Sequence, residues 1–207
     1  LEKGKTMMKE VEETYFVHLV DGKEYTGSLY HEFTAKDRRE LNISDNMAGV
    51  YATITAAIAD ANLRGISGAT RFMLTDALYE EPAFINVPAI VGVSAVNTLT
   101  IKPSIGVSPT VQVNSTSPVF VTNCDYFILD GSNTDGGTTR DMTLQNLGVG
   151  ASSGGYFSGS SVATNNNTVK NCIVRNSGTT ISFGIVFNSG ANNSATNNWV
   201  YKTNLGI

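Results

Sequence analysis

The sequence has few of the residues that build disulfide scaffolds, metal sites and membrane spans. Its 207 residues include two cysteines and two histidines. Two cysteines are too few for a disulfide framework, and Cys124 and Cys172 lack the paired spacing of a zinc site. No apolar stretch reaches the length of a transmembrane helix. We therefore expect a soluble, folded chain without a membrane span.

Basic residues are too few for a nucleic-acid surface. Lys and Arg number 14 against 18 Asp and Glu, which gives a formal net charge of −4. Such a chain offers little positive surface for releasing counterions from phosphates. We therefore expect no nucleic acid among its partners.

Charge is unevenly distributed and divides the chain in two. Residues 1–45 hold 17 charged side chains, whereas the following 162 residues hold 15. Such a break separates two structural regimes, which we place at residues 1–46 and 47–207.

The charged part, 1–46, is expected to contain a β-hairpin. Two strand-like runs, 14–20 and 25–30, flank Asp21-Gly22, a dipeptide typical of tight hairpin turns. The only histidines, His18 and His31, lie here, and we interpret them as surface residues because neither has a nearby base or nucleophile. Whether this part is foreign to the rest stays open.

The second part begins with a helix and continues as short strands. Ile54, Ala57, Ile58 and Ala61 recur at helical spacing, which predicts a short amphipathic helix near 53–63. Short β-rich runs follow, separated by Gly, Ser, Asn and Pro. They include residues 71–75, 99–102, 110–113, 119–122, 126–129 and 142–145.

An internal repeat selects a solenoid among the all-β folds. Residues 166–174 align with 192–200 at an offset of 26, and Gly184-Ile185 recurs at Gly206-Ile207 at an offset of 22. A period in the twenties, built of strands and polar turns, is typical of coiled repeats that stack to form a core. We expect Asn171 and Asn197 to occupy equivalent turns and to form an asparagine ladder, since Asn tolerates left-handed backbone angles.

These motifs resemble a known family. The pattern Asn-Asn-Thr-x-x-Asn-x-Ile/Val, followed by Gly-Ile, is similar to the repeats of the pectin-lyase-like superfamily, and 51–60 resembles the helix that caps its first coil. Segments 63–70, 97–103, 125–133 and 139–146 resemble secreted β-helix proteins of Bacteroidetes and related phyla, which carry type IX secretion sorting domains. The resemblance covers 47–207. It implies an all-β, right-handed parallel β-helix solenoid with a short N-terminal capping helix, in a secreted or cell-surface protein.

Several β-helix families degrade polysaccharides, so catalytic carboxylates are of interest. The segment 133–136, Asn-Thr-Asp-Gly, is similar to a polygalacturonase motif, yet the chain has no Asp-Asp pair and no acidic residue after Asp141. We interpret 133–136 as a turn. A calcium-dependent lyase site is the alternative, and its only available ligands are Asp125, Asp130, Asp135 and Asp141. We expect Arg140 to pair with a neighbouring carboxylate.

Aromatic side chains are the candidates for carbohydrate contact, because sugars stack on exposed rings. They are Tyr156, Phe157, Trp199 and Tyr201. Neighbours in a strand alternate sides, so both Trp199 and Tyr201 lie outside if Val200 points inward. The alternative is that one aromatic fills the interior of a coil.

Two further expectations come from the repeat. Cys124 and Cys172 are 48 residues apart, which as two coils of about 4.8 Å would keep them about 9.6 Å apart, so we predict free, buried thiols. The sequence stops at the first residues of another repeat. We therefore expect the natural polypeptide to continue, with end-to-end self-association through an open C-terminal coil as the alternative.

Two functional classes fit these features. The first is a non-catalytic exported or cell-surface module, which acts as a stalk, an adhesin or a scaffold that binds polysaccharide or a cell-surface glycan. The second is a fragment of a polysaccharide lyase or glycoside hydrolase whose active site is incomplete in these coils.

Overall fold

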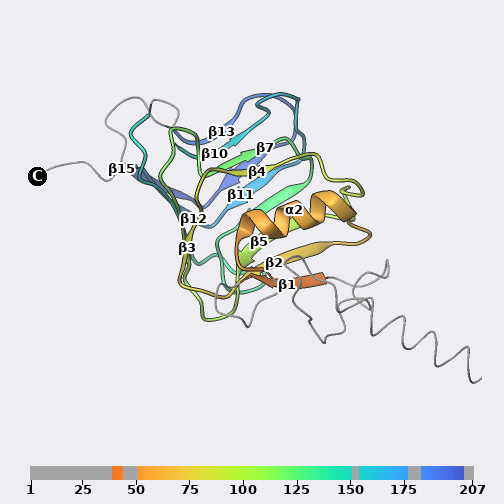
Figure 1. The fold of residues 1–207 in the computed structure, drawn as a ribbon, viewed down its shortest axis with the longest axis horizontal. Coiled ribbons are helices and arrows are strands. Elements are labelled where there is room, and N and C mark those ends of the chain that lie inside the picture. Colours follow the sequence, from red (N-terminus) through yellow and green to blue (C-terminus); the bar gives the residue numbers. More distant parts are fainter. Residues whose placement is uncertain (1–38, 44–50, 151–153, 177–182, 203–207) are drawn as a thin grey trace, which may run out of the picture.

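In the computed structural model, the described residues are 39–43, 51–150, 154–176 and 183–202. They form one helix, α2 (Ile54–Arg64), and three sheets in which every pairing is parallel (Figure 1). The six-stranded sheet contains, in order, β1 (Arg39–Ile43), β2 (Thr70–Leu74), β5 (Leu99–Pro103), β8 (Phe127–Asp130), β11 (Thr168–Lys170) and β14 (Ser194–Thr196). The five-stranded sheet contains β3 (Leu78–Glu80), β6 (Thr110–Val113), β9 (Met142–Asn146), β12 (Cys172–Asn176) and β15 (Trp199–Lys202). The four-stranded sheet contains β4 (Ile85–Val87), β7 (Phe120–Thr122), β10 (Gly154–Ser158) and β13 (Phe183–Phe187).

The strand order is that of a solenoid. From β2 onward, each strand pairs with the strand three places later in the chain, so one passage through the three sheets makes one coil. Four complete coils, β2–β4, β5–β7, β8–β10 and β11–β13, are followed by β14 and β15. The predicted all-β parallel solenoid is therefore confirmed, and the six predicted strand segments lie on β2 and β5–β9.

The predicted repeat register is also confirmed. Thr168 pairs with Ser194 and Ile173 with Trp199, both at the offset of 26. Asn171 and Asn197 occupy equivalent turns with φ values of 57° and 53°. The Asn197 side-chain amide donates to Asn171 Oδ1 at 2.7 Å, which forms the expected ladder. Non-glycine residues rarely adopt such angles, and Asn is favoured among those that do.

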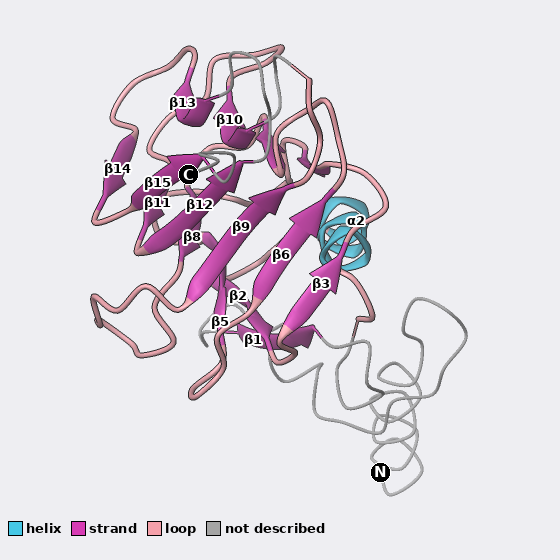
Figure 2. Cartoon of the chain, turned by 90° about the vertical axis from the view of Figure 1, so that its left-hand side faces the viewer, coloured by secondary structure: helices cyan, strands magenta, loops and turns pink. Residues whose placement is uncertain are grey.

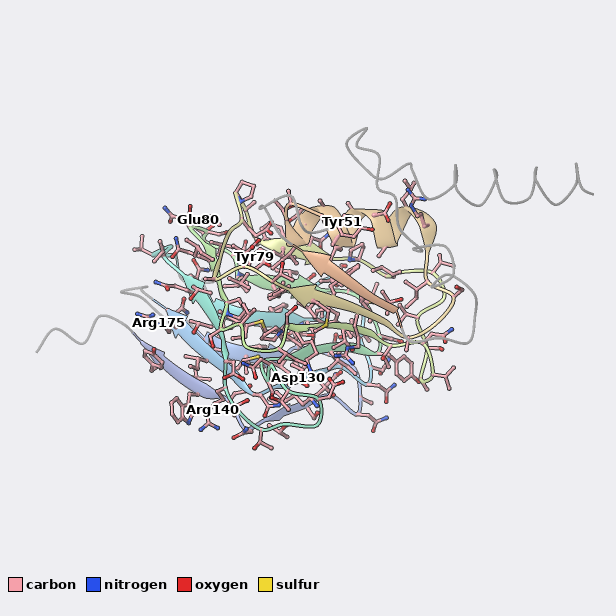
Figure 3. The ribbon with its side chains drawn as sticks, turned by 90° about the horizontal axis from the view of Figure 1, so that it is seen from below. Tyr51, Tyr79, Glu80, Asp130, Arg140 and Arg175 are labelled. Carbon is pink, nitrogen blue, oxygen red and sulfur yellow. The ribbon has the colours of Figure 1, made fainter. Side chains whose placement is uncertain are left out.

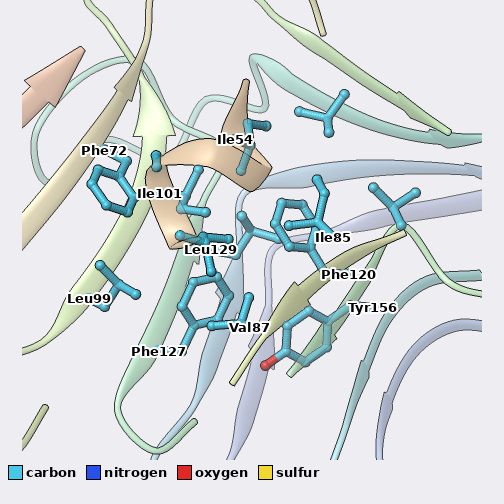
Figure 4. Packing of buried hydrophobic residues seen from close by; sticks show 14 of the residues in the cluster. Ile54, Phe72, Ile85, Val87, Leu99, Ile101, Phe120, Phe127, Leu129 and Tyr156 are labelled. Carbon is cyan, nitrogen blue, oxygen red and sulfur yellow. The ribbon is translucent and has the colours of Figure 1, made fainter. Parts of the chain in front are cut away.

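The core is a set of columns that run through the coils (Figure 4). The three columns contain Phe72, Ile101, Leu129 and Val169; Tyr79, Val111, Leu144 and Val174; and Ile85, Phe120 and Tyr156. All of these side chains are buried. Phe127 and Tyr156 stack across the interior with ring centroids 6.4 Å apart. Burial of each such side chain contributes about 1.5–3 kcal/mol, and a coil obtains it by stacking on the neighbouring coils or, at the first coil, also on the helix.

Helix α2 covers the end of the solenoid at the first coil, as expected (Figure 3). Its apolar face, which includes Ile54 and Ile58, is buried. The buried Glu81 carboxylate accepts hydrogen bonds from Ile54 N at 2.7 Å and from Thr55 Oγ1 at 2.6 Å, which satisfies donors at the helix N-terminus. Asp60 is buried and accepts from the Tyr51 hydroxyl at 2.7 Å.

The charge boundary does not coincide with the edge of the sheet. Strand β1 lies within the charged part, yet it pairs with β2 as the first strand of the six-stranded sheet. Charge counts do not reveal a single strand at the end of a charged segment. The hairpin predicted at 14–30, His18, His31 and the repeat at 206–207 lie outside the described residues. Within the described ranges, no helix has the length and apolar content needed to cross a bilayer.

Both cysteines are free and buried, as predicted, but for a different geometric reason. Cys172 opens β12 opposite Met142, whereas Cys124 lies between β7 and β8. The two thiols are therefore in different columns. The predicted separation of the cysteines assumed that all coils have the same length. This is wrong, because Ile128 pairs with Thr168 of the next coil at an offset of 40 residues.

Candidate functional site

Two aromatic rings lie side by side on the outside of the last described coil. Trp199 and Tyr201 are 57% and 46% exposed on β15. Val200 between them pairs with the buried Val174, and a Cβ placed on Gly184 would come within 2.2 Å of its Cγ1. Val200 therefore points inward, which confirms the condition under which both rings face out. Val200 is itself 54% exposed, since no described coil covers it.

An arginine accompanies each ring. The Arg140 guanidinium carbon lies 4.0 Å from the Trp199 ring centroid, and that of Arg175 lies 5.8 Å from the Tyr201 ring. These are cation–π distances. Arg140 also donates to Asn197 Oδ1, and within the described ranges it forms no ion pair with a carboxylate, contrary to the expectation. We call Arg140, Arg175, Trp199 and Tyr201 the platform; both arginines are labelled in Figure 3.

A long loop carries Arg140 to the platform. Residues 131–141, here called the strap, connect β8 and β9, whereas Asn171 alone connects β11 and β12. The ends of the strap meet where Asp141 N donates to Gly131 O at 2.9 Å, as in a compact Ω-loop. Its predicted turn at 133–136 is confirmed, since Gly137 N donates to Thr134 O at 3.1 Å.

The strap contacts all of the other coils. Asn133 Nδ2 donates to Val107 O of the second coil at 3.3 Å, and Gly137 O accepts from Asn171 of the fourth at 3.2 Å. Thr138 O accepts from Asn197 of the last coil at 2.7 Å. Insertions of this kind in repeat proteins gather on one face, which is often the binding face.

Asp135 anchors the strap to the first two coils. Its carboxylate accepts from Arg71 Nη1 and Nη2 at 3.0 and 2.8 Å and from Lys102 Nζ at 2.7 Å. The two cationic side chains are 4% exposed, whereas Asp135 is 58% exposed. Hydrogen bonds from Arg71 and then Lys102 hold the pKa of the Asp135 carboxyl well below its usual range.

The four aspartates of the calcium alternative do not come together. Asp125 accepts from Asn165 N at 2.7 Å, Asp130 pairs with Lys170 at 3.2 Å, and Asp141 accepts from Asn133 N at 2.9 Å. Asp135 instead binds the buried side chains of Arg71 and Lys102. Across the described ranges, no three His, Cys, Asp or Glu side chains are arranged to hold a metal ion. Closeness in sequence was misleading, because each carboxylate serves a different turn or ion pair.

Tyr156 does not belong to the platform. It is fully buried in the core, packs on Phe127 and Phe187, and burial raises the pKa of its hydroxyl. The prediction of Tyr156 as a carbohydrate contact is therefore wrong, and the alternative of an interior aromatic holds at this position.

The sequence did not lead to three residues of this region, Arg175, Arg71 and Lys102. Arg175 aligns with Tyr201 at the same offset of 26, so the repeat could have placed it beside that ring. Arg71 and Lys102 carry no motif, and each lies in a run that resembles any other strand.

Comparison with known proteins returns no matching family model, no matching curated protein and no matching solved structure. The chain is therefore assigned to a fold by its geometry and to no family. The chemistry of the platform rests on its own residues, namely the two exposed rings of β15 and the guanidinium groups of Arg140, from the strap, and Arg175, from β12.

Proposed function

We propose that this chain is a non-catalytic, glycan-binding module of an exported or cell-surface protein, and that the platform is its binding surface. One observation carries the proposal: Trp199 and Tyr201 are exposed on the same face of β15, each beside a guanidinium group. The apolar face of a sugar stacks on such rings, and guanidinium donors bind the hydroxyl or carboxylate groups at its edge.

The rigidity of the platform supports this proposal. Both rings lie on a strand held in register by β12, and Arg140 is held by Asn197. Groups fixed before binding lose little conformational entropy when a ligand arrives. Such a surface suits a stalk or an adhesin that must hold glycan without changing shape.

The aspartates support binding rather than cleavage. Glycoside hydrolysis needs two carboxyl groups facing one bond across about 5–9.5 Å of open space. Asp125, Asp130, Asp135 and Asp141 instead each hold a different hydrogen-bonded partner. This arrangement favours binding. A fragment of a polysaccharide lyase or glycoside hydrolase is the alternative to be tested.

The test uses Trp199 as its own probe, because it is the only tryptophan in the chain. We expect its emission to change on titration with at least one of pectic, cellulosic or host-type glycans. Calorimetry with the same glycan should show binding weakened about tenfold in Trp199→Ala. The matched control is Phe84→Ala, which removes an exposed ring away from the platform and should leave binding unchanged.

Two results would contradict the proposal. One is an unchanged emission and no heat of binding with all three glycan classes. The other is the release of reducing ends or unsaturated products from any of them, with or without calcium, which would favour the enzyme fragment.

A further inference from the structure

The outward face of the five-stranded sheet continues the platform along the solenoid. Two columns of outward side chains run through its five strands in register. One contains Leu78, Thr110, Thr143, Ile173 and Trp199, and the other contains Glu80, Gln112, Gln145, Arg175 and Tyr201. None of the ten is buried. Figure 2 looks onto these strands, which lie side by side across the front of the molecule.

This face differs from the outer face of the six-stranded sheet. There the strap and its ion pairs bury Arg71 and Lys102. On the five-stranded sheet the outward residues are exposed or half-buried from β3 to β15, and Glu80 and Arg175 lie on the same side of the molecule (Figure 3). Strands in a sheet are about 4.8 Å apart, so the face from Leu78 to Trp199 is about 19 Å long.

The middle of the face is polar. Thr110, Gln112, Thr143 and Gln145 place hydroxyl and amide groups on β6 and β9, and Gln112 Nε2 donates to Glu80 Oε1 at 3.2 Å. A protein-binding surface has its apolar residues at the centre and its polar residues at the rim. Here the large rings lie at one end and the centre can donate and accept hydrogen bonds, which favours a ligand rich in hydroxyl groups.

We infer that the glycan site extends from the platform along this face to Gln112, so that the ligand is a linear oligosaccharide or polysaccharide lying along the solenoid axis. This inference rests on the proposed function of the platform. One sugar ring stacks on Trp199 or Tyr201, and the following units contact Gln145, Thr143 and Gln112 in turn. The module therefore recognises the interior of a chain, over several sugar units, rather than a single terminal sugar.

The experiment measures affinity against ligand length with the whole chain. The probes are cello-oligosaccharides and oligogalacturonides of two to six units, titrated by calorimetry. We expect affinity to rise about tenfold from the dimer to the hexamer of the series that binds. In the double variant Gln112→Ala/Gln145→Ala, the hexamer should weaken by about threefold to tenfold, as expected for lost hydrogen bonds, while the dimer is unchanged.

Asn86→Ala is the matched control, since Asn86 is an exposed amide on β4 of another sheet. It should bind the hexamer as the unchanged protein does, and a thermal melt of each variant checks that it is folded. Equal affinity at all lengths, together with loss of binding in Trp199→Ala, would overturn the extended site and leave the platform standing. Binding of neither series at any length, together with no binding of the host-type glycans, would overturn both and favour a protein partner for this face.

Discussion

Replacing Asp135 by Asn tests whether the strap positions the platform. The substitution keeps the shape of the side chain but removes the charge that faces Arg71 and Lys102. Asp135 is five residues before Arg140, whose guanidinium group lies 4.0 Å from the Trp199 ring. We therefore expect Asp135→Asn to loosen the strap and to change the environment of Trp199, although the two residues belong to different coils.

The expected loss of stability is modest. Hydrogen bonds between charged groups contribute about 1.5–3 kcal/mol each when shielded. Asp135 is 58% exposed, so solvent screens its three bonds, and we expect about 1–2 kcal/mol for the set. For a chain of this size that corresponds to a melting temperature lower by about 3–6 °C. Glu80→Gln is the control, because it removes one negative charge at an exposed position.

The pH dependence has a definite sign. The folded-state pKa of Asp135 is lowered, so its contribution is present above the unfolded pKa of about 3.9 and is lost as pH falls. The stability difference between the unchanged protein and Asp135→Asn should therefore be constant near neutral pH and shrink below about pH 4.

Trp199 emission separates positioning from simple stability, since Trp199 is the only tryptophan. In folded protein, Asp135→Asn should shift the emission in the same direction as Arg140→Ala. In an Arg140→Ala background, Asp135→Asn should add nothing. If Asp135→Asn melts at a lower temperature but keeps the emission of the unchanged protein, the strap does not position Arg140 beside Trp199. If it melts at the same temperature as Glu80→Gln, Asp135 does not anchor the strap.

Three further outcomes follow from the buried contacts. Glu81→Ala should lower the free energy of unfolding by about 2 kcal/mol in urea denaturation, because Ile54 N loses its buried acceptor. Cys124 and Cys172 should resist alkylation in the native protein and react fully in denaturant, since both are buried and burial raises both thiol pKa values; a mass gain on native protein would contradict their placement. Asn171→Ala should destabilise more than Asn171→Gly by about 1 kcal/mol, because both lose the ladder but only Gly accepts φ of 57° without strain.

The features that could be predicted from sequence are those set by local alternation or by the repeat. Residues 166–174 and 192–200 are separated by 26 residues with short turns, so the sequence offset equals the coil offset. The outward positions of Trp199 and Tyr201 followed from alternation once Val200 was placed inside. The cap helix was readable because its apolar residues recur at helical spacing over three turns.

The features that failed depend on contacts distant in sequence. Asp135 is 64 residues from Arg71 and 33 from Lys102, and no local pattern reports such a pairing. Tyr156 follows two glycines and precedes Phe157, and the one polar residue of the strand, Ser158, is itself buried on the side of Tyr156, so alternation does not show which ring faces inward. Insertions such as the strap also change coil length, which is why the spacing of the cysteines could not be converted into columns.

The solenoid limits where function can be placed. Each interior position is set by the coil before and after it, so a change there must be accommodated by a whole column. Outward positions and loops are free of this constraint. The strap is such a loop, and its arginine ends on the outward ring of the last described coil. The proposed binding surface lies where the strap and the outward face meet, and there the described part of the fold combines a loop that is free to vary in sequence with the support of a paired strand.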